Sequence, residues 1–240
     1  MRKLGKVYEG KAKILYETDE PELIIQHFKD DATAFDGKKR GKIFGKGSAN
    51  AQISSILFRL LEEEGIKTHF PSDMQDKKIL SENEILAYRL KMIPLEIIVR
   101  NVAAGSLAKR LGYEEGRILK KPIVEFYYKS DELGDPLLNA DHICELGLVD
   151  SKLLRRMKET SLKVNEILKD FLAERGLELV DFKLEFGLKD DELILADEIS
   201  PDTCRLWDKR TGEILDKDRF RRDLGGVERA YQEVLRRIKG

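Results

Sequence analysis

The most regular alternation of hydrophobic and polar positions in this chain lies close to residue 180. Between residues 179 and 187 the sequence is LVDFKLEFG, in which Val180, Phe182, Leu184 and Phe186 alternate with three charged residues and a glycine. A repeat of two residues predicts a β-strand with one apolar face and one charged face. The turn-forming letters KDDE follow, and after them comes a second apolar run. This order predicts a hairpin that carries carboxylates on both of its arms.

Apolar residues at helical spacing predict three longer helices. Ser48 is expected to cap the first helix, which ends at Gly65. The second is predicted over residues 152–175, with Ser151 as its cap, and it is the longest of the three. The last is predicted over residues 224–238. The apolar stripes of these helices are expected to face a common core.

Short β-branched or aromatic runs predict strands elsewhere. Two of them, residues 6–8 and 14–16, lie on either side of a glycine-containing turn, and a buried strand is expected over residues 93–100. A further strand is expected near residues 68–70. Residues 30–47 are rich in Gly, Asp and Lys, so this segment is predicted to form a loop.

Length and element order are compatible with an α+β protein of one domain or two lobes. A chain of 240 residues permits one large domain or two lobes that share a cleft. The β-rich start precedes the carboxylate hairpin, which is the lobe order of protein kinases, but the HRDLxxxN and DFG motifs of those enzymes are missing from the sequence.

The composition and the shortness of the apolar runs argue against several classes of function. Charged residues make up 37% of the chain, yet the net charge is -1, so the charges are mixed in sign and give no basic field for nucleic acid. The first residues, MRKLGKVYEGK, lack the apolar segment of a secretory signal, and no apolar run approaches membrane-spanning length. The two cysteines lie far apart and have no zinc-ligand spacing. We expect a cytoplasmic protein that binds neither membranes nor nucleic acid.

Two stretches carry residues that could hold anions. Gly10 permits a tight turn and close backbone approach, and Lys11 and Lys13 add positive charge there, although a plain surface hairpin would have the same sequence. Arg100 ends the buried strand, and Ser106 opens a short helix. A guanidinium and helix-terminal amides can bind an anion together. An ion-paired arginine followed by an ordinary serine cap is the alternative.

The charged face of the hairpin is the candidate metal site. Asp181, Glu185 and Asp197 would repel one another unless a cation lay between them, and Mg²⁺ is the usual one. The alternative is a salt-bridged surface in which Lys183 neutralises its neighbours. An even, two-residue turn would place Asp197 on the opposite face from Glu185. A shared metal site therefore predicts a three-residue loop or a bulge between residues 188 and 197.

Four stretches resemble one family of enzymes. MIPLEIIVRNVAAGS, residues 92–106, and LVDFKLEFG, residues 179–187, are similar to the two signatures of the SAICAR synthetase (phosphoribosylaminoimidazole-succinocarboxamide synthase) family. YEGKAK near the start and DEISPDTCRLWD, residues 197–208, also match, so the resemblance covers nearly the whole chain. It implies a two-lobed, kinase-like fold with an ATP cleft between the lobes, and a homodimer. We expect a β-rich N-terminal lobe of residues 1–92 and a mixed α/β C-terminal lobe of residues 93–240.

The resemblance also implies a reaction. Enzymes of this family condense 5-aminoimidazole-4-carboxylate ribonucleotide (CAIR) with L-aspartate in de novo purine biosynthesis, converting ATP to ADP and phosphate with Mg²⁺ as cofactor. Phosphorylation of the CAIR carboxylate would create a leaving group, so we expect an acyl-phosphate intermediate. A small-molecule kinase on a similar scaffold is the main alternative. A nucleic-acid module that uses the basic residues 38–42 is disfavoured by the near-zero net charge.

The family's residue roles transfer to matching positions. Nucleotide-binding roles fall on Gly10, Lys11, Ala12, Lys13, Leu15 and Met92. Substrate-binding roles fall on Arg100, Ser106, Arg205, Asp36 and Arg221. Glu185 and Asp197 would hold Mg²⁺, and Lys183 would face the reacting centre as a catalytic residue with Asp181 beside it.

Overall fold

The computed structural model of the protein describes residues 1–34, 37–71 and 79–240. Its first sheet is antiparallel, in the order β1 (Lys3–Glu9), β2 (Lys13–Thr18), β3 (Leu23–Phe28), β7 (Glu84–Tyr88) and β6 (Ile79–Ser81). Helix α1 (Lys46–Glu63) packs against β3 and β7. A separate two-stranded hairpin, β4 (Asp31–Ala34) and β5 (Lys39–Lys42), lies beside them.

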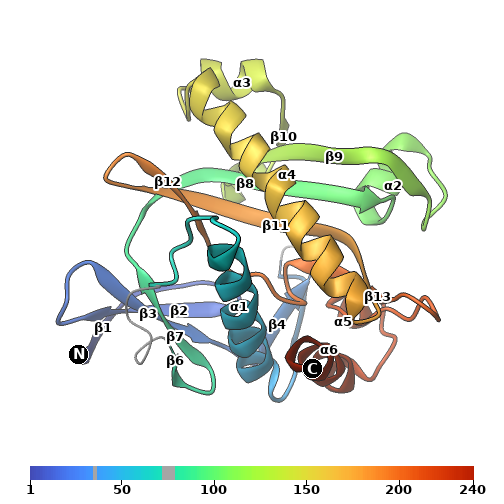
Figure 1. The fold of residues 1–240 in the computed structure, drawn as a ribbon, viewed down its shortest axis with the longest axis horizontal. Helices are drawn as coiled ribbons and strands as arrows, with labels where there is room; N and C mark the ends of the chain where they lie inside the picture. Colours follow the sequence, from blue (N-terminus) through green and yellow to red (C-terminus); the bar gives the residue numbers. More distant parts are fainter. Residues whose placement is uncertain (35–36, 72–78) are drawn as a thin grey trace.

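The second sheet contains the longest strands. Its order is β10 (Leu137–Leu138), β9 (Ile118–Tyr128), β8 (Lys91–Val102), β11 (Leu177–Lys189) and β12 (Glu192–Ala196). Strand β13 (Cys204–Asp208) pairs with the first half of β11, on the edge whose second half pairs with β12. Helix α4 (Ser151–Glu174) crosses this sheet, as Figure 1 shows. The shorter helices are α2 (Gly105–Leu111), α3 (Ala140–Glu145), α5 (Asp218–Arg221) and the 3₁₀ turn Asp131–Leu133.

The C-terminal helix ties the two sheets together. Helix α6 (Val227–Lys239) packs on α1 at the lower edge of the molecule in Figure 1, although α1 belongs to the first part of the chain. A backbone connection adds to this contact: the Leu195 amide donates to the Lys67 carbonyl, and the His69 amide donates to the Leu195 carbonyl. The described part of the chain holds no helix long and apolar enough to cross a membrane.

The alternating pattern around residue 180 forms the centre of the second sheet. Phe182, Leu184 and Phe186 are buried in the main hydrophobic core, on the face of β11 that α4 covers. The charged residues between them occupy the opposite face, so the predicted two-faced strand is confirmed. A register shift against β13 lies between Leu179 and Asp181, and Val180 packs in a small separate cluster with Trp207.

The hairpin turn differs from the one that a shared metal site was expected to need. Glu185 pairs with Ala196, and the register runs without interruption to Lys189 opposite Glu192. Asp190 and Asp191 form a two-residue turn with φ values of 50° and 62°. Positive φ at both central positions matches the right-handed twist of the arms. The predicted three-residue loop or bulge is therefore wrong.

Three local predictions around α1 also fail. The helix begins at Lys46, not after Ser48, because the carboxylate of Asp30 accepts hydrogen bonds from the amides of Gly45, at 3.2 Å, and Gly47, at 2.9 Å. The predicted loop over residues 30–47 contains the β4–β5 hairpin. The strand expected near residues 68–70 is reduced to a single bridge between Thr68 and Leu195.

The remaining helix predictions are confirmed to within a few residues. Helix α4 spans the predicted segment, but Asp150 caps it, since its carboxylate accepts a 2.7 Å hydrogen bond from the Leu153 amide. The predicted buried strand over residues 93–100 is β8, and the predicted glycine turn joins β1 to β2. The observed architecture is α+β, as predicted.

Candidate active site

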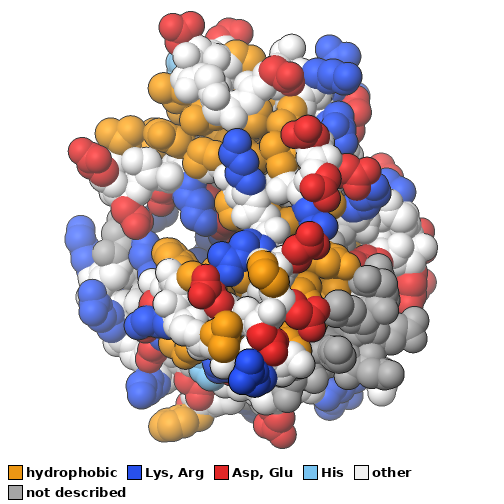
Figure 2. Space-filling view, turned by 90° about the vertical axis from the view of Figure 1, so that its left-hand side faces the viewer, with side chains coloured by type: hydrophobic (Ala, Val, Ile, Leu, Met, Phe, Trp, Pro, Cys, Tyr) orange, Lys and Arg blue, Asp and Glu red, His pale blue; other side chains and the backbone are white. Residues whose placement is uncertain are grey.

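A cleft of about 1140 Å³ lies between the two sheets. The β1–β2 turn and the β4–β5 hairpin line one side, and the charged face of β8 and β11 lines the other. Figure 2 shows a hollow on this side of the molecule with Lys, Arg, Asp and Glu side chains around it.

Strand pairing gathers the polar side chains of the second sheet on one face. Arg100 of β8 lies opposite Asp181 of β11, and Glu96 lies opposite Glu185. On the other side of β8, Glu96 lies opposite Tyr127 of β9. Paired residues of neighbouring strands point to the same face. The sheet therefore presents a continuous row of acids and bases to the cleft.

Lysines and carboxylates fill the end of the cleft nearest the first sheet. We call this group the lysine cluster; it consists of Lys13, Lys129, Lys183, Glu96, Glu185, Asp197 and Glu198. The Lys183 ammonium contacts three of the acids: Glu96 at 3.2 Å, Asp197 at 3.0 Å, and Glu185 more closely. Lys13, from β2 of the first sheet, pairs with Asp197. The cluster therefore joins the two sheets.

These contacts set the charge states of the cluster. Burial alone would lower the pKa of Lys183, but the carboxylates of Asp197, Glu185 and Glu96 outweigh burial and hold that pKa well above its usual value. Burial alone would raise the pKa of Asp197, but Lys13 and Lys183 outweigh it and hold that pKa well below its usual value. Both groups are therefore charged at neutral pH.

Asp197 reaches the cluster by a route that the hairpin register does not predict. It lies one residue beyond the end of β12, where its backbone adopts a left-handed conformation with φ of 68°. The alternation of strand faces stops there, so the side chain turns toward Glu185. Asp197 and Glu185 both contact the Lys183 ammonium. The two predicted metal-binding carboxylates are thus brought together although the predicted bulge is missing.

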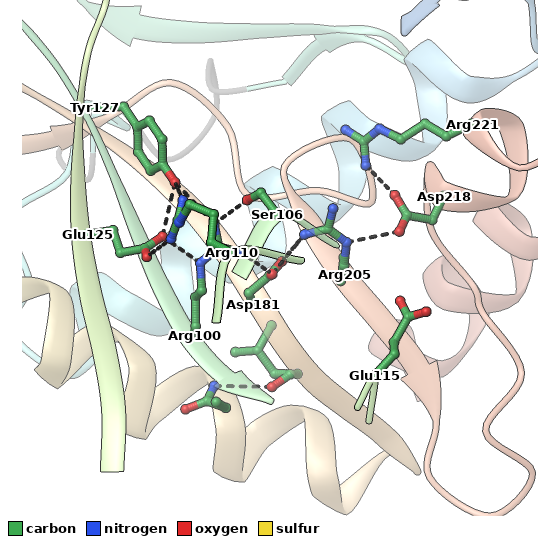
Figure 3. Close-up of polar contacts among 12 residues, drawn as sticks. Arg100, Ser106, Arg110, Glu115, Glu125, Tyr127, Asp181, Arg205, Asp218 and Arg221 are labelled. Atoms are coloured by element: carbon green, nitrogen blue, oxygen red, sulfur yellow. Dashed lines mark hydrogen bonds and ion pairs between the residues drawn. The ribbon is translucent and has the colours of Figure 1, made fainter. Parts of the chain in front are cut away.

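Arginines and carboxylates fill the other end of the cleft (Figure 3). We call this group the arginine cluster; it consists of Arg100, Arg110, Arg205, Arg221, Glu125, Asp181 and Asp218. One oxygen of Asp181 accepts from Arg100 at 2.9 Å and from Arg205 at 2.7 Å. Asp218 joins Arg205, at 2.9 Å, to Arg221. Asp181 therefore orients two arginines, and no contact joins it to Lys183 within the described part of the chain.

The packing of Arg205 depends on a glycine. Gly105, the first residue of α2, has φ of 53°, and a Cβ atom added there would lie 2.5 Å from Arg205 Nη2. Any larger residue would push the guanidinium away. Burial lowers the pKa of Arg205, but Asp181 and Asp218 outweigh burial and raise it above its usual value. The arginine therefore stays charged under all ordinary conditions.

The segment between β12 and β13 is held rigidly at the floor of the cleft. Ser200 donates a 2.7 Å hydrogen bond to Glu198, and Lys46 of α1, which is only 1% exposed, donates a 2.7 Å hydrogen bond to Asp202. The Tyr231 hydroxyl of α6 donates to the other oxygen of Asp202 at 2.7 Å. These bonds fix the turn that the Ser-Pro-Asp sequence predicts and place Arg205 beyond it.

Most of the other predicted site residues also line the cleft. Gly10, Lys11 and Ala12 do so at the β1–β2 turn, where Lys11 pairs with the exposed Asp131 at 3.3 Å. Leu15 and Met92 do not line it, and Met92 is 45% exposed. The predicted substrate-binding residue Asp36 lies outside the described residues.

Sequence reasoning missed several charged residues of the two clusters, namely Glu96, Lys129, Glu198, Arg110, Glu125 and Asp218. A period of two was present for some of them. Glu125 and Tyr127 lie two residues apart on β9, and Lys129 follows directly after that strand. On β8, Glu96 and Arg100 lie on the same face. Such alternation of polar residues marks a strand face that is not part of the core.

The arrangement is suited to two different charged ligands. Carboxylates with nearby lysines can hold a polyphosphate together with its divalent cation. Arginine guanidinium groups form a planar fork that matches a phosphate or a carboxylate. A nucleotide at one end of the cleft could therefore meet a second anionic molecule at the other.

Comparisons with known proteins agree on one family. The family model described as SAICAR synthetase matches residues 6–238. The phosphoribosylaminoimidazole-succinocarboxamide synthase of Coprothermobacter proteolyticus is 54% identical over 239 residues, which cover 99% of each chain. The synthase of the same name from Persephonella marina is 53% identical and aligns with 100% of this chain and 98% of its own.

Solved structures show the same similarity. The phosphoribosylaminoimidazole-succinocarboxamide synthase of Ehrlichia chaffeensis superposes with a TM-score of 0.93 at 48% identity, covering 98% of both chains. A SAICAR synthetase in complex with ADP superposes with a TM-score of 0.92 at 53% identity, covering 97% of both chains.

Proposed function

Because this chain belongs to the SAICAR synthetase family, we infer that it condenses CAIR with L-aspartate in de novo purine biosynthesis. ATP is converted to ADP and phosphate in this reaction, and the product is the succinocarboxamide ribonucleotide. The observation that carries this proposal is the pairing of a lysine–carboxylate cluster with an arginine cluster in one cleft. The lysines and carboxylates suit a nucleoside triphosphate with its cation, and the arginines suit a phosphorylated substrate.

The chemistry explains why ATP is needed. A carboxylate is a poor acyl donor, because its negative charge repels an incoming amine. An oxygen of the CAIR carboxylate attacks the γ-phosphorus, and ADP leaves. The amine of aspartate then attacks the carbonyl carbon of the acyl phosphate, loses a proton, and expels phosphate. The first step moves a phosphoryl group between two anions, so positioning and positive charge are the main contributions that the protein can make.

The ATP phosphates lie against the β1–β2 turn in this proposal. Gly10, Lys11 and Ala12 line the cleft at that turn. Lys13 follows the turn, and its ammonium neutralises phosphate charge. Adenine would then pack near Leu15 and Met92, where the first sheet meets β8. We propose on this basis that residues 1–92 form the nucleotide lobe and residues 93–240 the substrate lobe.

Glu185 and Asp197 fit a Mg²⁺ ion. Both are carboxylates, both contact the Lys183 ammonium, and carboxylate oxygens are the ligands that this ion prefers. Among residues 1–34, 37–71 and 79–240 no three acidic, histidine or cysteine side chains are grouped to hold a metal alone, so phosphate oxygens would complete the shell. When bound, the ion offsets the charge that builds up on the phosphates.

The ribonucleotide phosphate is placed at the arginine cluster. Arg100, Ser106, Arg205 and Arg221 line that end of the cleft, and Arg100 is the most buried of them, with 1% of its surface exposed. With its phosphate at the arginine cluster, CAIR directs its carboxylate toward Lys183, whose ammonium stabilises negative charge at the reacting centre. Asp181 contributes to catalysis by holding Arg100 and Arg205 in place. Asp36 stays a proposed substrate contact.

Assembly and location are proposals with more limited support. Ile118, 78% exposed, and Leu137, 46% exposed, are large apolar side chains near opposite ends of β9, and we propose that a second copy covers one of these ends in a homodimer. Cys144 and Cys204 are both free thiols, as expected of a cytoplasmic protein. Sedimentation at micromolar concentration tests the homodimer, which a monomeric species would exclude.

An assay that couples ADP release to a colour change tests the reaction. We expect ADP release to require both CAIR and aspartate, and mass spectrometry to detect the succinocarboxamide product. Full ATP turnover without aspartate would contradict the ligase function and favour a small-molecule kinase. CAIR labelled with ¹⁸O in its carboxylate tests the intermediate, since an acyl phosphate transfers one label to phosphate. Unlabelled phosphate would exclude that route.

A further inference from the structure

Glu125 of β9 binds two members of the arginine cluster, Arg100 and Arg110 (Figure 3). One of its oxygens accepts a 2.7 Å hydrogen bond from Arg100 Nε and a 3.1 Å hydrogen bond from the Tyr127 hydroxyl. Its other oxygen pairs with Arg110 of α2. Glu125 is 9% exposed and does not line the cleft. It can therefore act on a ligand through Arg100 and not by touching it.

Two carboxylates fix the orientation of Arg100. Glu125 binds its Nε, and Asp181, on a different strand, binds its Nη1. A guanidinium is planar, so two anchors on separate atoms determine its plane. The remaining nitrogen, Nη2, donates a 3.0 Å hydrogen bond to Ser106 Oγ. Nη2 is thus aimed at the serine.

This contact uses Ser106 as an acceptor and leaves the proton of its hydroxyl available. The oxygen accepts from Arg100, and across the described ranges its proton is given to no acceptor. Ser106 is exposed and lines the cleft. A hydroxyl has one proton to donate, so this proton is free for an anionic oxygen in the cleft. Arg205 and Arg221 lie at the same end of the cleft.

We propose that Glu125 is a positioning residue for the phosphate of the ribonucleotide substrate. It fixes Arg100, which in turn presents Ser106 to the phosphate as a hydrogen-bond donor. Arg110 and Tyr127 are part of the same device, because they occupy the remaining positions around the Glu125 carboxylate. This inference rests on the proposed function for the identity of the substrate. Its physical content is that phosphate affinity depends on a residue outside the cleft.

Glu125→Gln tests this inference, since the change keeps the size of the side chain and removes its charge. We expect the KM for CAIR and the Ki of ribose 5-phosphate, competing with CAIR, each to rise about 30-fold. The KM for ATP should stay within about twofold of the wild-type value, because the lysine cluster is unchanged. A merely structural role would lower kcat and raise every KM together.

Glu233→Gln is the matched control. Glu233 also accepts from two arginines, Arg236 and Arg237, but it lies on α6 away from the cleft. Its substitution should leave both ribose phosphate constants unchanged. If folded Glu125→Gln binds CAIR and ribose 5-phosphate as wild type does, the inference is wrong. Should that variant not fold, Tyr127→Phe decides the matter, with a rise of about threefold to tenfold expected and no rise overturning it.

Calorimetric titration of ribose 5-phosphate separates this inference from the proposed function. It measures phosphate binding without any turnover. Weaker binding by Glu125→Gln in a chain that forms no succinocarboxamide product would support the positioning role and contradict the proposed reaction. Equal binding of ribose 5-phosphate by wild type and Glu125→Gln, in a chain that does form the product, would contradict the positioning role and support the proposed reaction.

Discussion

The lysine cluster and the arginine cluster lie at opposite ends of one cleft and differ in their balance of charge. The lysine cluster has three lysines and four carboxylates, whereas the arginine cluster has four arginines and three carboxylates. The first is short of positive charge and suits an added cation. The second is short of negative charge and suits an added anion. The two ends of the cleft are thus suited to ligands of opposite charge.

The two clusters also differ in how they are built. The lysine cluster draws Lys13 from β2 and its carboxylates from the second sheet, so it spans both sheets. The arginine cluster comes entirely from residues 100–221 and is held by planar, two-ended contacts such as Arg205 between Asp181 and Asp218. Movement of the two sheets relative to each other would change the first cluster and spare the second. We therefore expect the binding site for the ribonucleotide phosphate to be formed before the ligand binds. The nucleotide-binding end of the cleft should change when the two sheets move closer together.

The largest test of this comparison is Asp197→Asn. The change removes a carboxylate that contacts both Lys13 and Lys183 and that is proposed to hold Mg²⁺. We expect kcat to fall about 1000-fold, because several kcal/mol of charge stabilisation at the phosphates are lost. The KM for CAIR should change little. ADP release measured against Mg²⁺ concentration checks both expectations.

Asp191→Asn is the control for this change. Asp191 lies at the tip of the same hairpin with φ of 62°, a conformation that asparagine also tolerates. It should retain wild-type activity. If Asp197→Asn kept more than about a third of the wild-type kcat, the acid-rich cluster would not be the cation site, and the contrast between the clusters would lose its meaning.

A smaller effect is expected from Arg205→Lys in the arginine cluster. One ammonium cannot reproduce the separate contacts of Nη1 with Asp181 and of Nε with Asp218. We expect the KM for CAIR to rise about 30-fold, with kcat within about threefold of the wild-type value. Steady-state kinetics with CAIR and ATP varied in turn measures the split. A fall in kcat with an unchanged KM for CAIR would place Arg205 at the reacting centre instead.

Arg236→Lys is the matched exchange outside the cleft. Arg236 pairs with Glu233 and its side chain is 70% exposed. Exposed ion pairs of this kind contribute little to the free energy of unfolding. The exchange should therefore leave kinetics and stability close to wild type.

The parts of this fold that local pattern determines were predictable. The alternation in β11, the apolar runs of β8, and the stripe of α4 each repeat over many residues, and all three were expected. The start of α1 was not, because its amides are capped by Asp30, which lies fifteen residues before Gly45. The β4–β5 hairpin has mostly polar, half-exposed residues, so it lacks the pattern of a buried strand.

The site was predictable to the extent that its residues stand in strand-borne motifs. Lys183, Glu185, Arg100 and Arg205 could be named from the sequence. The convergence of Asp197 on Glu185 could not be derived from the register, since it depends on one left-handed backbone angle. The partners of Asp181 also depend on which strands flank β11, and a single sequence does not contain that information.

His69 offers the smallest test, because its pKa depends first on burial and then on two members of the lysine cluster. Its ring is buried against Phe58, and burial, strengthened by the Lys13 ammonium and opposed by Asp197, lowers its pKa from 6.5 to about 3. Below pH 6.5 the unfolded chain takes up a proton that the folded chain refuses. The free energy of unfolding should therefore fall by about 1.4 kcal/mol from this group between pH 7.5 and pH 5.5. Urea unfolding at the two pH values measures the fall, and His69→Gln should remove that share of it. An equal pH dependence in wild type and His69→Gln would mean that the folded chain protonates His69 as readily as the unfolded chain does, and that burial does not lower its pKa.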